Sequence, residues 1–205
     1  MRVTDPEKHQ AKKQMILEAA KICFAEQGFH QTSTAQICTA AQISTGSLFH
    51  YFPSKKSIIA AIVEEDRQQT QELVATLREQ DDLYAALNVF FDVVLDVAAD
   101  RILSALALEI AAEAGRDAEI GALYQLSDKV MRQELEYLVS LGVERGQIGK
   151  QFSASAAVHC LMIIVDGIFN RVAIDPEFKP QEHKAAFRAM LWGVLGNRAD
   201  AGAKL

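Results

Sequence analysis

The chain has 205 residues, of which half are hydrophobic and only four are proline, a composition that indicates a packed globular protein and excludes a disordered one. The net charge of −6 taken alone argues against nucleic acid, but residues 1–56 carry a net +3 and residues 57–205 a net −9. Such a basic end can approach phosphates while the rest is repelled, although the same asymmetry is also compatible with a surface charge of no functional meaning.

Cysteine usage and the absence of targeting signals predict a cytoplasmic protein. The three cysteines, Cys23, Cys38 and Cys160, have no framework spacing, which is typical of a reducing compartment. The polar residues 1–15 predict no signal peptide. The longest apolar run, residues 161–165 with an Ala-rich approach, is too short for a bilayer, so we expect no contact with a membrane.

Apolar residues at three- and four-residue spacing predict a first helix over residues 12–27 with one buried stripe. Gly28 follows at a position where a left-handed backbone ends a helix, and Phe29 can pack back onto the last turn. The stripe consists of Ile16, Ala20, Cys23 and Phe24.

Three serines predict where the next three helices begin. Ser33 opens a capping-box pattern, and Ser44 precedes a short helix that runs to about residue 51. Pro53 forces the chain out of that short helix. Ser54 then caps a long helix that continues to about residue 78.

Glycines and prolines divide the rest of the chain into five further helical segments. No alternating pattern is long enough for a strand, so we predict an all-α protein of about nine helices. We expect a three-helix head, residues 1–56, joined by the long helix to a helical body, residues 57–205. The five segments are residues 83–99, 101–114, 117–145, 155–173 and 181–195.

The helices near residues 33–41 and 44–51 are spaced as a helix-turn-helix, in which the second helix enters the major groove of DNA. Gly46 allows the backbone to approach the bases closely, while Thr45 and Ser47 can hydrogen-bond base edges or phosphates. This pattern is also compatible with an ordinary helical hairpin whose polar residues face solvent.

Four further residues extend the candidate DNA surface. His50 and Tyr51 lie one turn further along and can reach sugar-phosphate or a thymine methyl group. Thr34 and Lys55 lie at the starts of their helices, where free backbone amides favour binding of a phosphate. The positive charge of Lys55 adds to this effect.

Taken together, the residues from about 16 to 62 resemble the DNA-binding head of the TetR family of transcriptional repressors. The resemblance covers about a quarter of the chain. The residues that carry it are Ile16–Ala20, Phe24–Phe29, Thr32, Ser33, Ile37, Ala40–Phe52, Ser54 and Lys55.

The resemblance implies a set of DNA contacts. Two residues depart from the family pattern: Gln42 replaces the usual turn glycine, so the turn must avoid a positive φ or bear strain, and Phe49 replaces a common tyrosine, which shifts its role toward packing. The implied contacts are Thr34, Thr45, Gly46, Ser47, Phe49, His50, Tyr51 and Lys55.

For the body, the resemblance implies a homodimer formed by the last two helices, whose two heads would bind a palindromic double-stranded operator. The nearly continuous apolar residues 156–168 fit a helix at such an interface, and equally fit a plain core helix. The candidate dimer contacts are Phe169, Phe187, Met190, Leu191, Trp192 and Val194.

The resemblance also implies a small-molecule effector in the body, whose identity the sequence does not disclose. Carboxylates on apolar helices could neutralise a cationic hydrophobic ligand, but they could equally face solvent or pair with arginines. The candidate effector contacts are Phe91, Asp92, Asp96, Glu109, Glu113, Met131 and Met162.

Two other classes of protein are alternatives to a DNA-binding regulator. An enzyme is disfavoured because no catalytic motif is present and because the neighbours His159 and Cys160 point about 100° apart on a helix. The cysteines and histidines lack metal-ligand spacing, so we expect neither a metal nor a cofactor. A helical adaptor that binds only protein remains the alternative to a DNA-binding repressor released by an inducer.

Overall fold

The computed structural model describes residues 6–196, which form nine α-helices, one short 3-10 helix and no strand, as the sequence predicted. Its elements are α1 (Pro6–Gln27), α2 (Thr34–Ala40), α3 (Thr45–Tyr51), α4 (Lys55–Arg78), α5 (Leu83–Ala99), α6 (Arg101–Ala114), α7 (Ala118–Glu144), α8 (Ala154–Ile174), η1 (Pro180–His183) and α9 (Lys184–Leu195).

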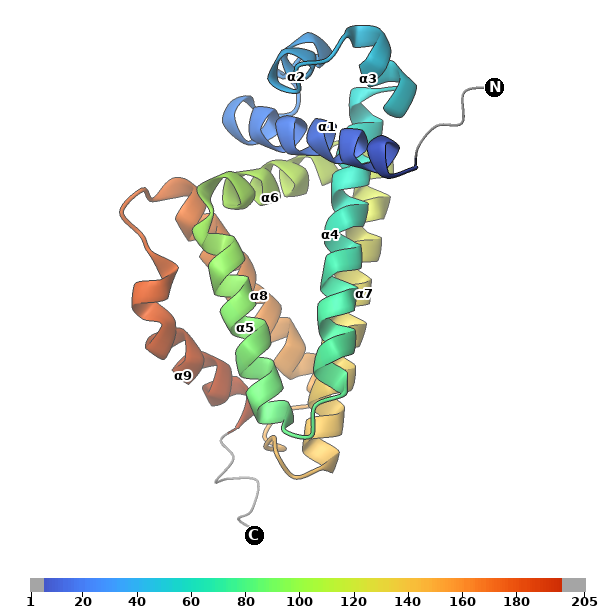
Figure 1. Cartoon of the computed structure of the whole chain (residues 1–205). Coiled ribbons are helices and arrows are strands. Elements are labelled where there is room, and N and C mark those ends of the chain that lie inside the picture. The colour runs from blue at the N-terminus through green and yellow to red at the C-terminus, as the bar shows by residue number, and fades with distance from the viewer. Residues whose placement is uncertain (1–5, 197–205) are drawn as a thin grey trace.

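The helices α1 to α3 sit at one end of an elongated molecule (Figure 1). Helix α4 leaves this end and runs beside α7 along one edge, while α5, α8 and α9 form the opposite side. Helix α6 lies across the top of the body, directly beneath α1, and contacts it. The head therefore rests on two parts of the body, α4 and α6.

The predicted serine caps set the helix boundaries in the head. The Ser33 side chain accepts a hydrogen bond from the Gln36 amide, while the Gln36 side chain accepts one from the Ser33 amide. The Ser44 and Ser54 side chains accept from the amides three residues later in the same way. Each cap satisfies a backbone donor that a helix start leaves free, so these short helices begin where the sequence places them.

Two separate hydrophobic clusters form the core. The first cluster lies in the lower body between α4, α5, α7, α8 and α9. The second fills the head and continues along α4 to Val63, with Leu106 and Ile110 of α6 and Ile120 of α7 added from the body. The division at residue 56 stays a prediction, and the packing beneath the head crosses it.

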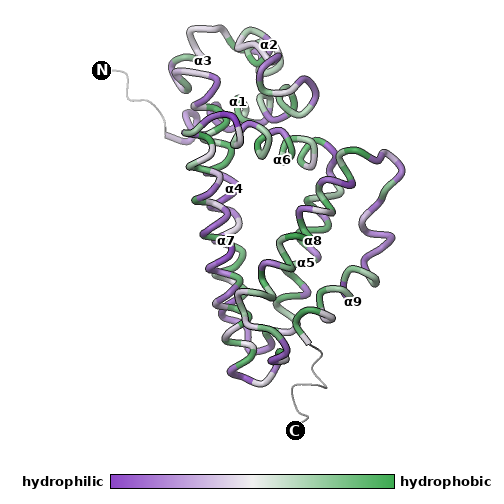
Figure 2. Tube along the Cα trace, turned by 180° about the vertical axis from the view of Figure 1, so that it is seen from behind, coloured by the Kyte–Doolittle hydropathy of each residue, from purple (hydrophilic) through white to green (hydrophobic). Residues whose placement is uncertain are grey.

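Helix α8, Ala154–Ile174, is much longer than the apolar run of residues 161–165 that the sequence interpretation judged too short for a bilayer. Apolar residues continue beyond Asp166, and by length and composition alone this helix could cross a membrane, although only 28% of its most apolar window is buried. Figure 2 shows hydrophobic residues along much of α8 and α5. Among the described residues it is the one such helix. Exposed apolar surface of this kind is typical of a site that contacts another protein or a membrane.

Candidate nucleic-acid interface

Helix α3 has one buried face and one open face. Leu48 is fully buried in the head core, where Ile37 of α2 is buried as well. Thr45, Gly46 and His50 are exposed on the other face. A Cβ added at Gly46 would meet nothing within 4 Å, so the start of α3 is free of neighbours. The helix is thus anchored from behind and presents small and polar groups outward.

The remaining predicted DNA contacts lie on the same end of the molecule. Phe49 is 46% exposed, which is high for a phenylalanine in a packed domain. Ser47 and Tyr51 are half-buried on α3, and Thr34 is half-buried at the first position of α2. These residues all belong to α2 or α3, the two helices at the outer end of the head (Figure 1).

The turn between α2 and α3 carries backbone strain. Gln42 has a φ of +52°, the left-handed region that favours glycine. The Ile43 amide donates to the Cys38 carbonyl oxygen at 3.0 Å, which closes the turn around Gln42. Of the two possibilities that the sequence left open, the chain therefore adopts the positive φ.

The Lys55 side chain points into the protein. Its ammonium group donates to the carbonyl oxygens of Phe29, His30 and Thr32, the last at 2.7 Å, and lies 4.5 Å above the Phe29 ring. Burial lowers the pKa of Lys55, and the nearby Glu113 carboxylate partly opposes that effect. In this structure Lys55 fastens the loop between α1 and α2 (residues 28–33), and its charge is not directed at the exposed surface.

The rings of His9, His50 and Tyr51 lie together at the C-terminal end of α3. The sequence interpretation did not include His9. Helix α1 begins at Pro6, earlier than the predicted residue 12, so His9 is helical. Its ring centroid lies 4.6 Å from that of Tyr51 and 6.2 Å from that of His50. The available signal was the spacing of residues 9, 13, 16 and 20, which continues the buried stripe backwards.

Two of the predicted effector contacts instead hold the head on the body. The Glu109 carboxylate of α6 accepts a hydrogen bond from the Phe29 amide at 2.6 Å. Glu113, one turn further on, is buried and lies 2.9 Å from His30 Nε2 and 3.9 Å from Arg116 Nη1. In this structure Glu109 is directed at the loop between α1 and α2, and Glu113 at that loop and at Arg116, which follows α6. That these two acids contact an effector stays a prediction.

Further ion pairs join the head to the body. Lys21 contacts Glu65 at 2.6 Å and Glu18 at 2.8 Å. Burial opposes the charge on Lys21, but its hydrogen bonds to these two carboxylates prevail and raise its pKa. Lys56, at the start of α4, lies 2.7 Å from Asp117, just before α7, and its hydrogen bond lowers the pKa of Asp117.

The other predicted effector contacts do not converge on one site. Phe91 is buried in the lower core, and Met131 packs against that core. Asp92 forms ion pairs with Lys184 at 2.8 Å and Arg188 at 2.6 Å, which tie α5 to α9. Asp96 is exposed and Met162 lies on α8. Asp92 therefore has cationic partners within the chain.

Met162 lines an open depression of about 290 Å³ between α7 and α8, here termed the α7–α8 depression. Burial, and secondly the negative charge of Asp128, raise the pKa of Asp166. Burial likewise raises the pKa of Tyr124, with Asp166 and Asp128 adding to the effect. The depression therefore combines two carboxylates with one arginine, which pairs with Asp128. The lining residues are Asp128, Arg132, His159, Met162, Ile163 and Asp166.

The predicted dimer contacts divide into inward and outward residues. Trp192 is buried, stacks on Tyr84 with ring centroids 3.6 Å apart and donates to Asn88 Oδ1 at 3.1 Å. Leu191 is also buried. Both side chains pack within the chain, and their contribution to a dimer interface stays a prediction. Met190 is 50% exposed, and Phe169, Phe187 and Val194 are half-buried against the lower core.

The fold and the exposed face of α3 define a helix-turn-helix regulator of transcription. The model of the bacterial regulatory proteins of the tetR family matches residues 16–62. The model of the C-terminal domain of BetI-type transcriptional repressors matches residues 79–196, more than half of the chain. The chain therefore belongs to the TetR family of effector-responsive transcriptional regulators, which are not enzymes.

Similar proteins span nearly the whole chain. The transcriptional regulator UidR of Escherichia coli K12 is 24% identical over 181 residues, which cover 88% of this chain and 91% of UidR. The structure of Salmonella enterica GusR has a TM-score of 0.75 and 28% identity, covering 95% of this chain and 99% of GusR. A Saccharomonospora viridis regulator solved with choline has a TM-score of 0.75 and 19% identity, covering 90% of this chain and 96% of that one.

Proposed function

We propose that this regulator is a cytoplasmic homodimeric repressor that binds a palindromic operator with one α3 in each of two neighbouring major grooves. The observation that carries the proposal is the division of α3 into a face anchored by Leu48 and an open face that begins at Gly46. Small groups at the start of a recognition helix permit close approach to base edges. The candidate contacts are Thr34, Thr45, Gly46, Ser47, Phe49, His50 and Tyr51, with Lys55 acting through its backbone.

The exposed sides of α8 and α9 support the proposed dimer. On α8, Ile163, which also lines the α7–α8 depression, is 69% exposed, and a Cβ added at Gly167 would meet nothing within 4 Å. On α9, Met190 is half exposed, and the same open space surrounds Gly193. An exposed apolar residue with an open glycine three or four residues further along lets a helix of a second copy approach closely, as in a four-helix interface. This would also cover the unburied part of α8.

For the effector, we propose a small organic cation bound at the α7–α8 depression. Two carboxylates, Asp128 and Asp166, line that depression. Asp128 forms an ion pair with Arg132, whereas Asp166 has no ion pair among the described residues. Choline bound to the similar Saccharomonospora viridis regulator supports the class of ligand. Ligand binding would shift the packing of the body and tilt α4, so that the two heads no longer match the groove spacing.

Replacing Gly46 tests the DNA-binding face. Gly46→Asp adds a negative charge where the side chain has open space, and an acid at a helix start does not disfavour the helix. The matched control is Gly46→Asn, which has nearly the same size and no charge. We expect Gly46→Asp to bind DNA from upstream of its own gene about tenfold or more weakly than Gly46→Asn, because like charges repel at an interface. Equal affinity of the two variants would refute the proposal.

Salt dependence separates the repressor from a protein adaptor. A complex that neutralises several phosphates loses affinity steeply as salt rises, since counterions are released on binding. Fluorescence anisotropy of a labelled duplex at two salt concentrations measures this slope. An adaptor would show no such complex at either concentration.

The effector proposal has its own test. Choline and its uncharged isostere 3,3-dimethylbutanol are compared by thermal shift, in the wild type and in Asp166→Asn. We expect stabilisation by choline alone, and a smaller one in the variant, because the carboxylate attracts the cation. Equal effects of the two compounds would refute a charge-selective site without affecting the DNA-binding proposal.

A further inference from the structure

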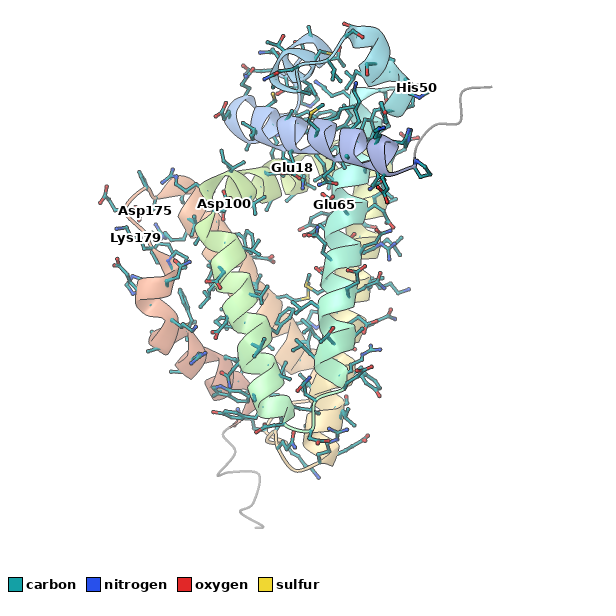
Figure 3. All side chains as sticks on the ribbon, in the orientation of Figure 1. Glu18, His50, Glu65, Asp100, Asp175 and Lys179 are labelled. Carbon is teal, nitrogen blue, oxygen red and sulfur yellow. The ribbon has the colours of Figure 1, made fainter. Side chains whose placement is uncertain are left out.

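The first turns of α1 lie beneath the end of α3, where His50 marks the outer tip of the head (Figure 3). His9 is the α1 residue that reaches α3. Its ring lies 4.6 Å from the Tyr51 ring at an interplanar angle of 33°, a tilted offset stack. It also meets the edge of His50, with ring centroids 6.2 Å apart at 85°. One histidine of α1 therefore contacts two of the aromatic residues in the last turn of α3, His50 and Tyr51.

Helix α3 itself provides little to fix that last turn. The helix has seven residues, and its C-cap Phe52 is already in an extended conformation before Pro53. Isolated helices of this length are unstable in water, so the direction of their side chains depends on tertiary contacts. Leu48 anchors the middle of α3 in the core, one turn before Tyr51. The end of α3 needs a separate support.

Tyr51 is held between two surfaces. One side of the residue packs against the head core, and its ring stacks on His9. Its ring also meets His50 edge-on, with centroids 5.2 Å apart at 86°. Offset-stacked and edge-on pairs favour particular ring orientations in addition to the area that they bury. The three rings consequently restrict the rotamers of the two residues that lie at the proposed DNA surface.

We propose that His9 is a positioning residue for operator binding, acting through Tyr51 and His50. The ring of His9 fixes the direction of the Tyr51 hydroxyl and of the His50 imidazole before DNA arrives, so less side-chain freedom is lost on binding. The proposal rests on the proposed DNA contact of Tyr51. In this proposal α1, which lies outside the helix-turn-helix, takes part in operator recognition.

A double-mutant cycle tests this role. The variants are His9→Ala, Tyr51→Ala and the double variant, with His9→Phe as the conservative replacement that keeps a ring. Gln10→Ala, at an exposed neighbour on the same helix, is the matched control. The probe is a duplex that the wild-type protein selects from a random-sequence library, and affinity is measured by fluorescence anisotropy at several salt concentrations.

We expect His9→Ala to weaken binding by about fivefold, the loss that corresponds to one aromatic pair, while His9→Phe and Gln10→Ala stay close to wild type. In the Tyr51→Ala background, His9→Ala should have a clearly smaller effect, since residues that act through each other are not additive and only the contact with His50 remains. The salt slope should not change, because His9 is not assigned a phosphate contact.

Two outcomes would overturn the inference. An undiminished fivefold loss in the Tyr51→Ala background, or a reduced salt slope, would show that His9 contacts DNA directly. Equal losses in His9→Phe and His9→Ala would exclude ring stacking as the cause. If Tyr51→Ala alone binds as well as wild type, the proposed DNA contact of Tyr51 is refuted. If the wild-type protein selects no duplex, the proposed function as a whole is refuted. Thermal unfolding of each variant shows whether the head is intact.

Discussion

Removing the Glu109 carboxylate should release the loop between α1 and α2 from the body. Glu109 Oε1 lies 2.6 Å from the amide nitrogen of Phe29, and Phe29 is buried. Glu109→Ala deletes the acceptor and leaves a shielded N–H without a partner. A hydrogen bond to a charged group contributes about 1.5–3 kcal/mol, so we take about 2 kcal/mol for this one. Since each 1.4 kcal/mol is a factor of ten, opening of the Phe29 amide should become about thirtyfold more frequent.

Hydrogen exchange followed residue by residue measures this opening directly. Glu109→Gln keeps an acceptor oxygen at the same position and should lose only part of the protection. Glu72→Ala removes an exposed glutamate from the middle of α4 and serves as the matched control. Exchange of the Ile37 amide, inside α2, reports whether the whole head has loosened.

One result would refute the reasoning. If the Phe29 amide exchanges at the wild-type rate in Glu109→Ala, the bond to α6 does not hold the loop, and the coupling of α6 to the head fails with it. A uniform loss of protection through Ile37 would show that the substitution unfolds the head, which contradicts a local role for Glu109.

Three further substitutions have definite expected results. Gln42→Gly should raise the free energy of unfolding in urea by roughly 1 kcal/mol, because glycine adopts the φ of +52° without strain; no gain would mean that the turn is unstrained. Burial first, and the charge of Asp128 second, raise the pKa of Asp166 in the folded chain. The charged carboxylate therefore lowers the free energy of unfolding above that pKa, and this destabilisation disappears as the pH falls through the pKa. Asp166→Asn should therefore stabilise by about 0.5 kcal/mol at neutral pH and not in acid, and a gain that persists in acid urea titrations would contradict this cause. Gly193→Glu should produce folded monomers in light scattering, since the open space at Gly193 accepts the side chain within one chain while the charge blocks the proposed dimer face; an intact dimer would place the interface elsewhere.

The head was predictable because its determinants are local in sequence. Ser33 and Ser44 each bond an amide three residues away, and Gly28 ends α1 with a φ of +79°. The buried stripe of α1 and the anchor Leu48 follow from helical spacing alone. The start of α1 was placed six residues late, because charged residues hide the continuation of the stripe to His9.

The roles of charged residues in the body were not predictable because their partners are distant in sequence. Glu109 bonds an amide 80 residues earlier, and Asp92 pairs with Arg188, 96 residues later. A carboxylate on an apolar helix has the same local pattern whether it faces a ligand, solvent or another helix. The same limit applies to Trp192, whose partner Asn88 lies 104 residues away on α5. Topology decides between these cases, and topology is not contained in a short window of sequence.

The contacts beneath the head restrict how a signal from the body can reach DNA. Lys55 fastens the first turn of α4 to the loop between α1 and α2, and Glu109 of α6 holds the same loop. Lys56 ties the same end of α4 to Asp117 ahead of α7. These contacts connect α4, α6 and α7 to one side of the head. A displacement of any of these three helices therefore moves the head as a unit more readily than it distorts α2 and α3. In the proposed dimer, a change in the distance between two intact heads is therefore the response that these contacts favour.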